Sequence, residues 1–328
     1  MQNQFNLKIT AFPRIHVTLI GMDSEGYRIN GGIGFSISDP KIYSTYSLSK
    51  EFEIIDEREF ALTINEKEKL VQRLKLIKSQ YCMEYSFICV LEGNSRTHFG
   101  LGSTSAIYLS SIEALFLLNK KPYTQFLIQT ISTRGGTSGI GIHSYFKGGC
   151  VFDTGVLRNN NSRLKPSSNF TNSQKLPLVL NHFNTPKWPI GVLFPTNIKN
   201  KSEDEEIEFF KKTCPIPNED VKTILYEVVY GLIGSLLEPD YEDFGNHVNS
   251  IQNTKWKHEE RSLYFPEILK IENVLVESGA KGIGMSSLGP SLYFTYDDYE
   301  RIQKININKN FETVFTTMNN KPRIIYHA

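Results

Sequence analysis

The sequence is 328 residues long, which favours two domains over a single core. Hydrophobic residues make up 40% of the chain and aromatic residues 12%, so there is enough apolar material for both cores, which argues against general disorder. The 36 Lys and Arg residues nearly balance the 35 Asp and Glu residues, which argues against non-specific binding to nucleic acid or to a membrane surface. Any bound anion must therefore be held by a local site.

The cysteines and the N-terminal segment indicate a cytosolic protein. The cysteines have neither C-x-x-C spacing nor the His/Cys spacing of a zinc site, so we expect reduced thiols. Residues 1–8 are polar, and Pro13, Arg14 and His16 interrupt the apolar segment that follows, which is unlike a signal peptide. No later segment approaches the roughly 18 apolar residues of a membrane span.

The first half of the chain is predicted to alternate strands with two helices. Alternating or β-branched apolar residues predict the strands, which cover 14–20, 31–37, parts of 41–64, and 85–91. A helix is predicted for 66–80, where Leu70, Leu74 and Ile77 recur at helical spacing. A second helix is predicted for 104–119, ending at Asn119.

Residues 158–187 are rich in Asn, Ser, Pro and Lys and predict a domain boundary or a long surface excursion. We place the boundary between 165 and 166, which gives an N-terminal domain of 1–165 and a C-terminal domain of 166–328. Beyond it the predicted elements are a strand at 188–194, helices at 203–213, 220–237, 244–252 and 265–278, and a strand at 291–296. Runs of strands and of helices favour an α+β fold.

The segment 98–106 predicts an anion site at a helix start. Its two glycines allow the backbone to approach a ligand closely and to adopt positive φ, and three hydroxyl residues follow them. The unpaired N–H groups of the first helical turn and the helix dipole then face the ligand. The alternative is a ligand-free glycine turn with a Ser or Thr cap. The loop lacks the Gly-Lys-Ser/Thr ending of a Walker A motif and the third glycine of a dinucleotide fingerprint. The residues assigned to this anion site are Gly100, Leu101, Gly102, Ser103, Thr104 and Ser105.

Two further glycine-rich segments follow, at 134–153 and 281–290. The first places Arg134, His143 and Lys147 close together, and its alternative reading is a hairpin with solvated cations. Three glycine-rich loops in one chain suggest a shared concave site. The residues that we assign to substrate binding in these two segments are Gly139, Lys147, Ser286, Ser287 and Gly289.

In this order and spacing, the three loops resemble the three motifs of the GHMP kinase superfamily, with 98–106 as its phosphate loop and 281–290 as its C-terminal glycine motif. A finer resemblance is to the β-ribofuranosylaminobenzene 5′-phosphate synthase family. The segments that carry it are 14–16, 31–34, 134–135, 138–141, 148–149 together with Asp153, 243–252 and 286–290. The resemblance implies a two-domain GHMP fold, with an N-terminal phosphate-loop domain and a C-terminal ferredoxin-like domain.

The resemblance also implies a reaction, a decarboxylating C-ribosyl transfer from phosphoribosyl diphosphate (PRPP). An aromatic carboxylic acid attacks ribose C1, diphosphate leaves, and carbon dioxide is lost from the newly bonded carbon. The archetypal members use 4-aminobenzoate or 4-hydroxybenzoate on the route to methanopterin, and relatives in C-nucleoside pathways use heteroaromatic carboxylates. A magnesium ion accompanying PRPP and a homodimer are further expectations.

A small-molecule kinase that uses ATP is the main alternative. In the superfamily's kinases the second motif reads Ser-Gly-Ile-Asp, whereas Ser138-Gly-Ile-Gly141 has a glycine where those kinases have the Asp. Glycine can neither act as a general base nor hold magnesium. The sequence therefore favours the transferase over the kinase, and a non-catalytic phosphosugar-binding relative is the third alternative.

The transferase reaction needs cations for the acceptor carboxylate and a base for the acceptor ring. Arg14 and Arg134 are the candidates for the first task, and His16 and His143 for the second, because imidazole titrates near neutral pH. Arg14 and His16 are two residues apart on a strand, so their side chains share one face of it. The sequence does not show whether this face lines the site or is exposed to solvent. His143 could equally be a core histidine. Asp153 either binds magnesium or caps a turn.

Overall fold

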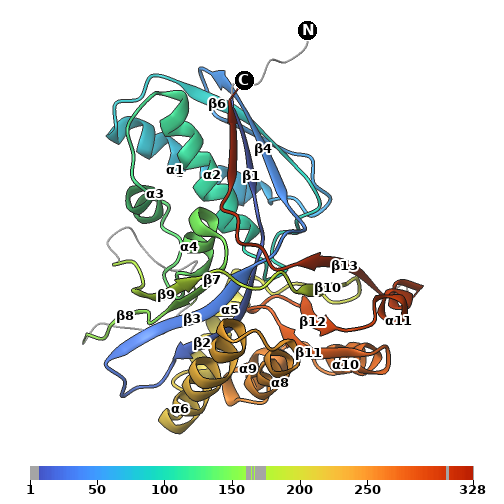
Figure 1. Cartoon of the computed structure of the whole chain (residues 1–328). Helices are drawn as coiled ribbons and strands as arrows, with labels where there is room; N and C mark the ends of the chain where they lie inside the picture. Colours follow the sequence, from blue (N-terminus) through green and yellow to red (C-terminus); the bar gives the residue numbers. More distant parts are fainter. Residues whose placement is uncertain (1–6, 160–163, 165, 167–174, 308–309, 328) are drawn as a thin grey trace.

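The computed structural model describes residues 7–159, 164, 166, 175–307 and 310–327, and combines three β-sheets with helices (Figure 1). This confirms the predicted α+β class. In the described part of the chain, no helix combines the length and the apolar character needed to traverse a bilayer.

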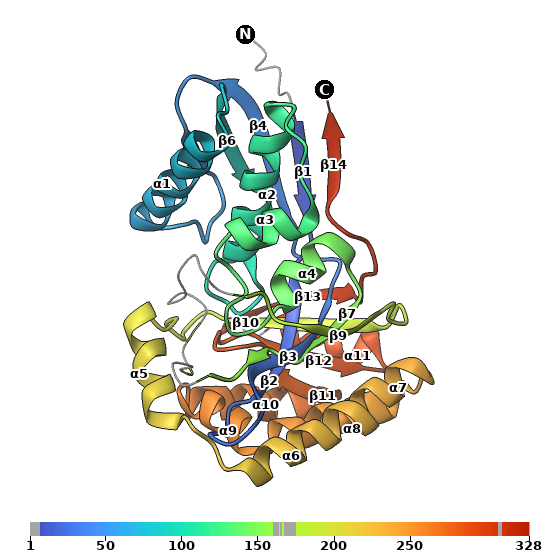
Figure 2. The same ribbon diagram turned by 90° about the vertical axis from the view of Figure 1, so that its left-hand side faces the viewer.

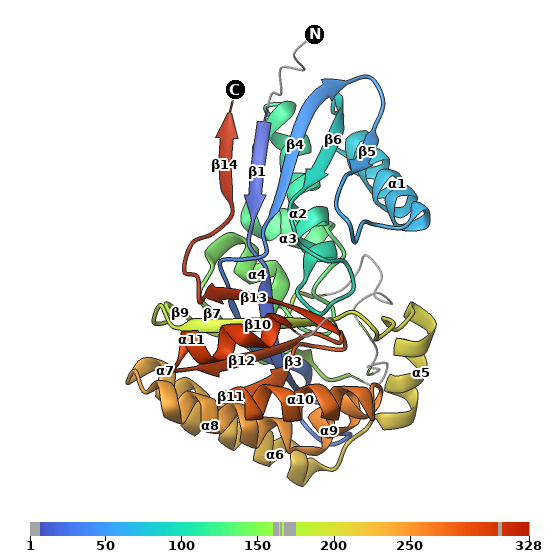
Figure 3. The ribbon, with the colours of Figure 1, turned by 90° about the vertical axis from the view of Figure 1, so that its right-hand side faces the viewer.

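The first sheet has the strand order β14-β1-β4-β6-β5 and carries its helices on one face (Figure 2 and Figure 3). Along β4, buried residues alternate with more accessible ones, as one-sided packing requires. The strands are β1 (Leu7–Ala11), β4 (Ile42–Ser49), β5 (Glu53–Asp56), β6 (Ser86–Glu92) and β14 (Ile324–His327). The helices are α1 (Ile64–Gln80), α2 (Ser103–Leu118) and α3 (Gln125–Ile131).

Helix α1 forms as its sequence predicts. Thr63 and Glu66 make a reciprocal capping box at its start, and Leu70, Leu74 and Ile77 are its buried residues. Helix α2 starts differently, because its N-cap is Gly102 in the left-handed region and no side chain caps it. The start of α2 therefore keeps its N–H groups available to a ligand.

The second sheet, in the order β2-β3-β7-β9, lies below the first and connects it to the C-terminal part (Figure 2). Its strands are antiparallel, and the short strand β8 pairs with β3. They are β2 (Arg14–Gly21), β3 (Arg28–Ser36), β7 (Cys150–Asp153), β8 (Val156–Leu157) and β9 (Val179–Phe183), and α4 (Ile140–Lys147) packs against β3 and β7.

The third sheet is antiparallel, in the order β11-β12-β10-β13, and most of the C-terminal helices lie beneath it (Figure 3). Its strands are β10 (Pro189–Pro195), β11 (Ala280–Met285), β12 (Leu292–Tyr296) and β13 (Phe311–Thr317). The helices are α5 (Glu203–Thr213), α6 (Asn218–Tyr226), α7 (Ile233–Leu237), α8 (Tyr241–Gln252), α9 (Lys255–Ser262), α10 (Glu267–Glu277) and α11 (Tyr299–Ile302). A π-helical turn, Glu227–Leu232, joins α6 to α7, and a 3-10 turn, Gln303–Ile307, follows α11.

Aromatic contacts join the second sheet to the C-terminal part. Phe35 on β3 makes edge-to-face contacts with Phe244 on α8 and Tyr293 on β12, with ring centroids 5.9 and 6.1 Å apart. All three side chains are buried in one hydrophobic cluster. This packing holds β2, which carries Arg14 and His16, against the C-terminal helices.

Four segments of the chain differ from what the sequence predicts for them, and several other elements, among them β1, α3, α9 and β13, are not predicted from the sequence. The helix expected at 220–237 contains the π-helical turn, and residues 281–285 form strand β11 instead of a loop. The segment 134–153 contains helix α4, and the predicted boundary segment 158–187 contains strand β9. In β9 and β11, pairing with a neighbouring strand outweighs a local composition typical of loops.

The domain limits 1–165 and 166–328 stay a prediction. Residue 165 and residues 167–174, next to the proposed boundary, lie outside the described residues. Near the end of the chain, β14 pairs with β1, Leu7 opposite His327, so the last strand returns to the first sheet.

Candidate active site

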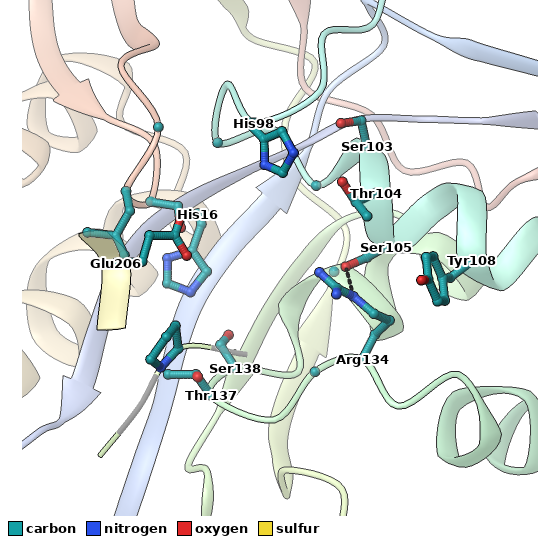
Figure 4. A pocket seen from close by; sticks show the side chains of 18 of the residues that line it. His16, His98, Ser103, Thr104, Ser105, Tyr108, Arg134, Thr137, Ser138 and Glu206 are labelled. Atoms are coloured by element: carbon teal, nitrogen blue, oxygen red, sulfur yellow. Dashed lines mark hydrogen bonds between the residues drawn. The ribbon is translucent and has the colours of Figure 1, made fainter. Parts of the chain in front are cut away.

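A cavity of about 540 Å³ lies where the start of β2, the phosphate loop, the first turn of α4 and helix α1 meet. Figure 4 labels ten of the residues that line it. Residues of α5 and α9 contribute to its lining. The predicted site residues that line it are Arg14, His16, Gly100, Gly102, Ser103, Thr104, Ser105, Arg134, Ser287 and Gly289. The predicted residues that do not line it are Leu101, Gly139, His143, Lys147 and Ser286.

The phosphate loop brings the start of α2 to the cavity. Gly100 and Gly102 have φ values of 79° and 76°, which favour glycine. The first α-helical hydrogen bond runs from Ala106 N to Gly102 O (3.1 Å), so the three preceding N–H groups lie outside the helical ladder. These N–H groups and the positive end of the helix dipole have the geometry that the predicted anion site needs.

The three hydroxyl residues of the loop have different roles. Ser103 is buried, and its hydroxyl donates to the carbonyl of Arg96 (2.9 Å), which fixes the loop. Thr104 and Ser105 line the cavity (Figure 4), and Ser105 Oγ accepts a hydrogen bond from Arg134 Nε (3.2 Å). Leu101 does not face the ligand site, because its side chain is part of the core.

Arg14 places a cation directly beside this loop. Its Nη1 donates to the carbonyl of Gly100, and its backbone N–H donates to the carbonyl of Leu101 (3.1 Å). Burial, and then the positive charge of Arg134, lower the pKa of Arg14 to about 10, so the guanidinium stays protonated at neutral pH. Arg14 Nε is buried, and no described group accepts a hydrogen bond from it. An anion in the cavity would supply that acceptor.

His16 lies on the same strand and also lines the cavity. Its side chain is buried, and Nδ1 finds no hydrogen-bond partner among the described residues. Burial, then the charges of Arg14 and Lys257, hold the pKa of His16 well below its ordinary value. The imidazole is therefore neutral at physiological pH, as a proton acceptor must be.

The third glycine-rich segment, 281–290, packs against the phosphate loop and holds it in place. Ser286 is buried, and its hydroxyl donates to the carbonyl of Gly100 (2.8 Å) while accepting from His16 N (3.0 Å). A Cβ at Gly100 or at Gly289 would collide with the backbone of the other loop. Ser286 thus joins β2 to the phosphate loop, whereas Ser287 and Gly289 reach the cavity lining.

Helix α4 turns part of the second motif away from the cavity. Gly141 lines the cavity, and residues two apart on a helix point in nearly opposite directions, so His143 faces away from it. His143 Nδ1 contacts Gln129 Nε2 (3.1 Å), and burial, then the charge of Lys147, lower the pKa of His143 to about 4. Gly139 packs against His143, and Lys147 is exposed.

Asp153 organises the approach to α4. Its carboxylate accepts hydrogen bonds from Gly139 N (2.9 Å), Gly155 N (2.9 Å) and Ser138 Oγ (3.2 Å). Burial raises the pKa of Asp153 to about 7 despite these donors. Asp153 is not part of the cavity lining, so of its two possible roles the geometry favours the turn cap.

The cavity includes side chains that the sequence did not point to. Polar residues of α1 line the cavity from the face next to its buried residues, and Arg73 Nε and Nη2 donate to the carbonyl of Ile131 (2.8 and 2.6 Å). Helical periodicity shows that this face is polar but not what it faces. Polar lining residues that the sequence analysis did not assign include, on α1 and on other elements, Glu66, Lys69, Gln72, Arg73, Tyr108, Thr137, Lys201, Glu206 and Glu260.

Comparison of whole structures defines the class of fold. A homoserine kinase from Cytophaga hutchinsonii aligns over 99% of both chains with a TM-score of 0.69 and 16% identity. The mevalonate kinase of L. major aligns over 96% of both chains with a TM-score of 0.66 and 13% identity. The chain therefore has the GHMP kinase fold, which confirms the fold expected from its motifs. No family model matches the sequence.

Sequence relatives define the family. The β-ribofuranosylphenol 5′-phosphate synthase of Methanothermobacter thermautotrophicus is 30% identical over 288 residues, 87% of each chain. The synthase of the same name from Archaeoglobus fulgidus is 30% identical over 291 residues, 89% of this chain and 88% of the relative. The chain belongs to the β-ribofuranosylphenol 5′-phosphate synthase family, and the expected enzyme class, a decarboxylating C-ribosyltransferase, is confirmed at that level.

Proposed function

We propose that this chain joins the ribose 5-phosphate of PRPP to an aromatic or heteroaromatic carboxylic acid, with release of diphosphate and carbon dioxide. The bond between ribose C1 and the diphosphate oxygen breaks, and its electron pair leaves with diphosphate. The ring carbon that bears the carboxylate bonds to C1. The bond to the carboxylate then breaks, carbon dioxide departs, and the electron pair returns to the ring.

The observation that carries this proposal is Arg14, a buried cation beside the N-terminus of α2 with Nε lacking an acceptor among the described groups. An anionic leaving group at this helix start would be stabilised by the N–H groups of the first turn, by Arg14, and by Arg134 through its contact with Ser105. Because these groups are already in place, the site needs little reorganisation as negative charge develops on diphosphate.

We place the acceptor ring at the His16 end of the cavity. Leu19, Phe210 and Leu288 line the cavity together with His16 and provide apolar surface for a flat ring. Neutral His16 can accept the proton of a ring hydroxyl, amino or N–H group, which raises the electron density at the attacking carbon. Arg14, on the same strand face, can hold the acceptor carboxylate until it leaves. The relatives' name specifies a phenol, one of the expected acceptor types.

For magnesium we propose that the ion arrives with PRPP and is held mainly by diphosphate oxygens and water. The described residues contain no cluster of three or more His, Cys, Asp or Glu side chains in a metal-binding arrangement, so they do not build a metal cage of their own. Glu206, which lines the cavity, is the carboxylate that we propose as the single protein ligand of the ion. Calorimetry of PRPP binding with and without magnesium tests this proposal.

We further propose a homodimer in a reducing, cytosolic compartment. The proposal rests on the frequency of dimers among soluble oligomers and on the four cysteines, which are all free thiols. Sedimentation analysis of the purified protein tests the assembly state, and a monomer at micromolar concentration would contradict it.

The test of the main proposal is a reaction with PRPP and a panel of aromatic carboxylates, including 4-hydroxybenzoate, 4-aminobenzoate and azole carboxylates. We expect diphosphate and carbon dioxide in equal amounts, and only when the acceptor is present. Release of diphosphate without carbon dioxide across the panel would contradict the proposal. The same panel with ATP in place of PRPP tests for kinase activity, and we expect no ADP because position 141 provides no carboxylate to the cavity.

A further inference from the structure

His98 occupies the rim of the cavity, two residues before Gly100. Figure 4 shows its ring beside Ser103 and Thr104, facing the space in front of the first turn of α2. The side chain is 46% exposed and its backbone has a φ of 64°, in the left-handed region that few residues other than glycine and asparagine adopt. His98, the first residue of the phosphate loop, therefore lies within the region proposed to hold diphosphate.

Glu66 fixes the orientation of this imidazole. His98 Nε2 lies 2.7 Å from Glu66 Oε1, and the other carboxylate oxygen accepts from Thr63 N and Thr63 Oγ1, both at 2.8 Å. The capping box of α1 thus anchors the carboxylate on one side, and the carboxylate holds the imidazole on the other. Nε2 is engaged with Glu66, and no described residue forms a hydrogen bond with Nδ1, so Nδ1 is the nitrogen left for a ligand.

The surrounding charges favour the protonated imidazole. The hydrogen bond that the imidazole donates to Glu66 raises the pKa of His98, as does the negative charge of Glu66, and burial opposes them. Glu206 on α5 raises the pKa further, and Arg134 lowers it. Hydrogen bonds from His98 and Thr63 hold the pKa of Glu66 at about 2 against the effect of burial, so this carboxylate stays charged.

We propose that His98, oriented by Glu66, is a further catalytic residue that donates a hydrogen bond and then a proton from Nδ1 to the departing diphosphate. The inference rests on the proposed function. As the bond between C1 and oxygen breaks, its electron pair goes to diphosphate, and a diphosphate oxygen takes the proton from Nδ1. The imidazole becomes neutral, keeps its Nε2–H on Glu66, and regains a proton from solvent before the next turnover.

Two variants test this role. His98→Asn keeps the left-handed backbone, which asparagine tolerates, and cannot transfer a proton. We expect kcat to fall about 100-fold while KM for PRPP changes less than tenfold, and the basic limb of the pH profile to disappear. Glu66→Gln keeps the capping box but removes the charge, so the pKa of His98 falls and the basic limb moves to lower pH. Wild-type kcat and an unchanged basic limb in His98→Asn would overturn the inference.

The matched control is His247→Asn. His247 Nδ1 lies 2.8 Å from Glu227 Oε2, an equivalent His–Glu pair that is not part of the cavity lining. We expect this variant to keep wild-type kcat and an unchanged pH profile. If His98→Asn does not fold, as judged by circular dichroism, the shift of the basic limb in Glu66→Gln decides the question.

A second measurement separates this inference from the proposed function. Imidazole carbon signals of the labelled wild-type protein are followed by NMR while inorganic diphosphate is added. We expect the His98 signal to shift and its titration to move to higher pH. A wild-type enzyme that turns over PRPP but shows no His98 response would overturn the inference alone. A His98 response in a protein that never releases carbon dioxide would overturn the proposed function and leave the contact with diphosphate standing.

Discussion

Gly141 lies beneath the guanidinium of Arg14. A Cβ at position 141 would lie 3.7 Å from Arg14 Nε and 3.8 Å from the Cβ of Ser105, at ordinary van der Waals distance. A side chain at 141 would therefore fit and would point to the cation that we place between the donor and the acceptor. The superfamily's kinases have an Asp at this position of the motif, and none of the described carboxylates makes an ion pair with Arg14 in this chain.

Substitution of Gly141 tests whether Arg14 must remain without a carboxylate partner. Gly141→Ala adds only the tolerated Cβ, so we expect turnover within about threefold of wild type. Gly141→Asp would pair with Arg14 and repel diphosphate, and we expect kcat/KM for PRPP to fall at least about 100-fold, or roughly 3 kcal/mol. Steady-state release of diphosphate measures both variants. Equal rates for the two variants would show that the charge at 141 does not matter.

Arg14 itself is expected to be indispensable. Arg14→Ala removes the cation and the bond to the carbonyl of Gly100, and we expect turnover to fall at least about 100-fold. Arg14→Lys retains the charge but not the planar fork of donors, so we expect an intermediate loss. Carbon dioxide release in single-turnover experiments checks the order of the three enzymes. Wild-type rates in Arg14→Ala would remove this residue from the active site.

A side chain at position 102 would disturb both the backbone of the phosphate loop and the guanidinium of Arg14. At φ of 76°, a Cβ would lie 3.1 Å from Arg14 Cζ and Nε, so a side chain would be strained and would displace the guanidinium. We expect Gly102→Val to abolish measurable PRPP binding and Gly102→Ala to weaken it at least tenfold. Calorimetry measures the affinity, and circular dichroism checks that the fold persists. A control is Gly234→Ala, because a Cβ there meets no atom within 4 Å.

Because His143 is largely buried, we expect the free energy of unfolding to depend on pH. Its pKa falls from about 6.5 in the unfolded chain to about 4 in the folded protein, because burial disfavours the charged imidazole. The contribution of His143 to stability is therefore complete above pH 6.5 and is lost as the pH falls towards 4, by up to about 3 kcal/mol. Urea unfolding of His143→Gln should show a smaller loss over this range than wild type. Exposed His258→Gln is the control, and equal slopes in both variants would contradict the prediction.

The ion pair between buried Glu113 and Arg323 is expected to stabilise the attachment of the C-terminal strand β14. Arg323, just before β14, donates to both oxygens of Glu113 at 3.0 and 2.5 Å, and the hydroxyls of Tyr123 and Tyr145 complete the carboxylate's partners. Arg323→Met would leave a buried negative charge without its cation, and we expect a loss of about 3 kcal/mol in urea unfolding. Lys281→Ala, which breaks an exposed ion pair with Asp297, should change stability little.

The anion site could be predicted from the sequence because its determinants are local. Two glycines followed by hydroxyl residues at a helix start specify free N–H groups and positive φ wherever the helix lies. Arg14 and His16 could also be predicted to share a face, because residues two apart on a strand always do. The motif resemblance that named the family rests on the same short segments.

Which residues meet across the cavity was decided only by tertiary structure. His143 and Lys147 follow Gly141 on one helix, and of these three residues the orientation of α4 brings only Gly141 to the cavity lining. Ser286, more than 180 residues from Gly100, donates a hydrogen bond to the carbonyl of Gly100 and is not part of the cavity lining. His98 contacts Glu66 on α1, which is 32 residues away in the sequence. Local sequence determines what a backbone segment can do, whereas burial and long-range hydrogen bonds determine which side chains meet the ligand.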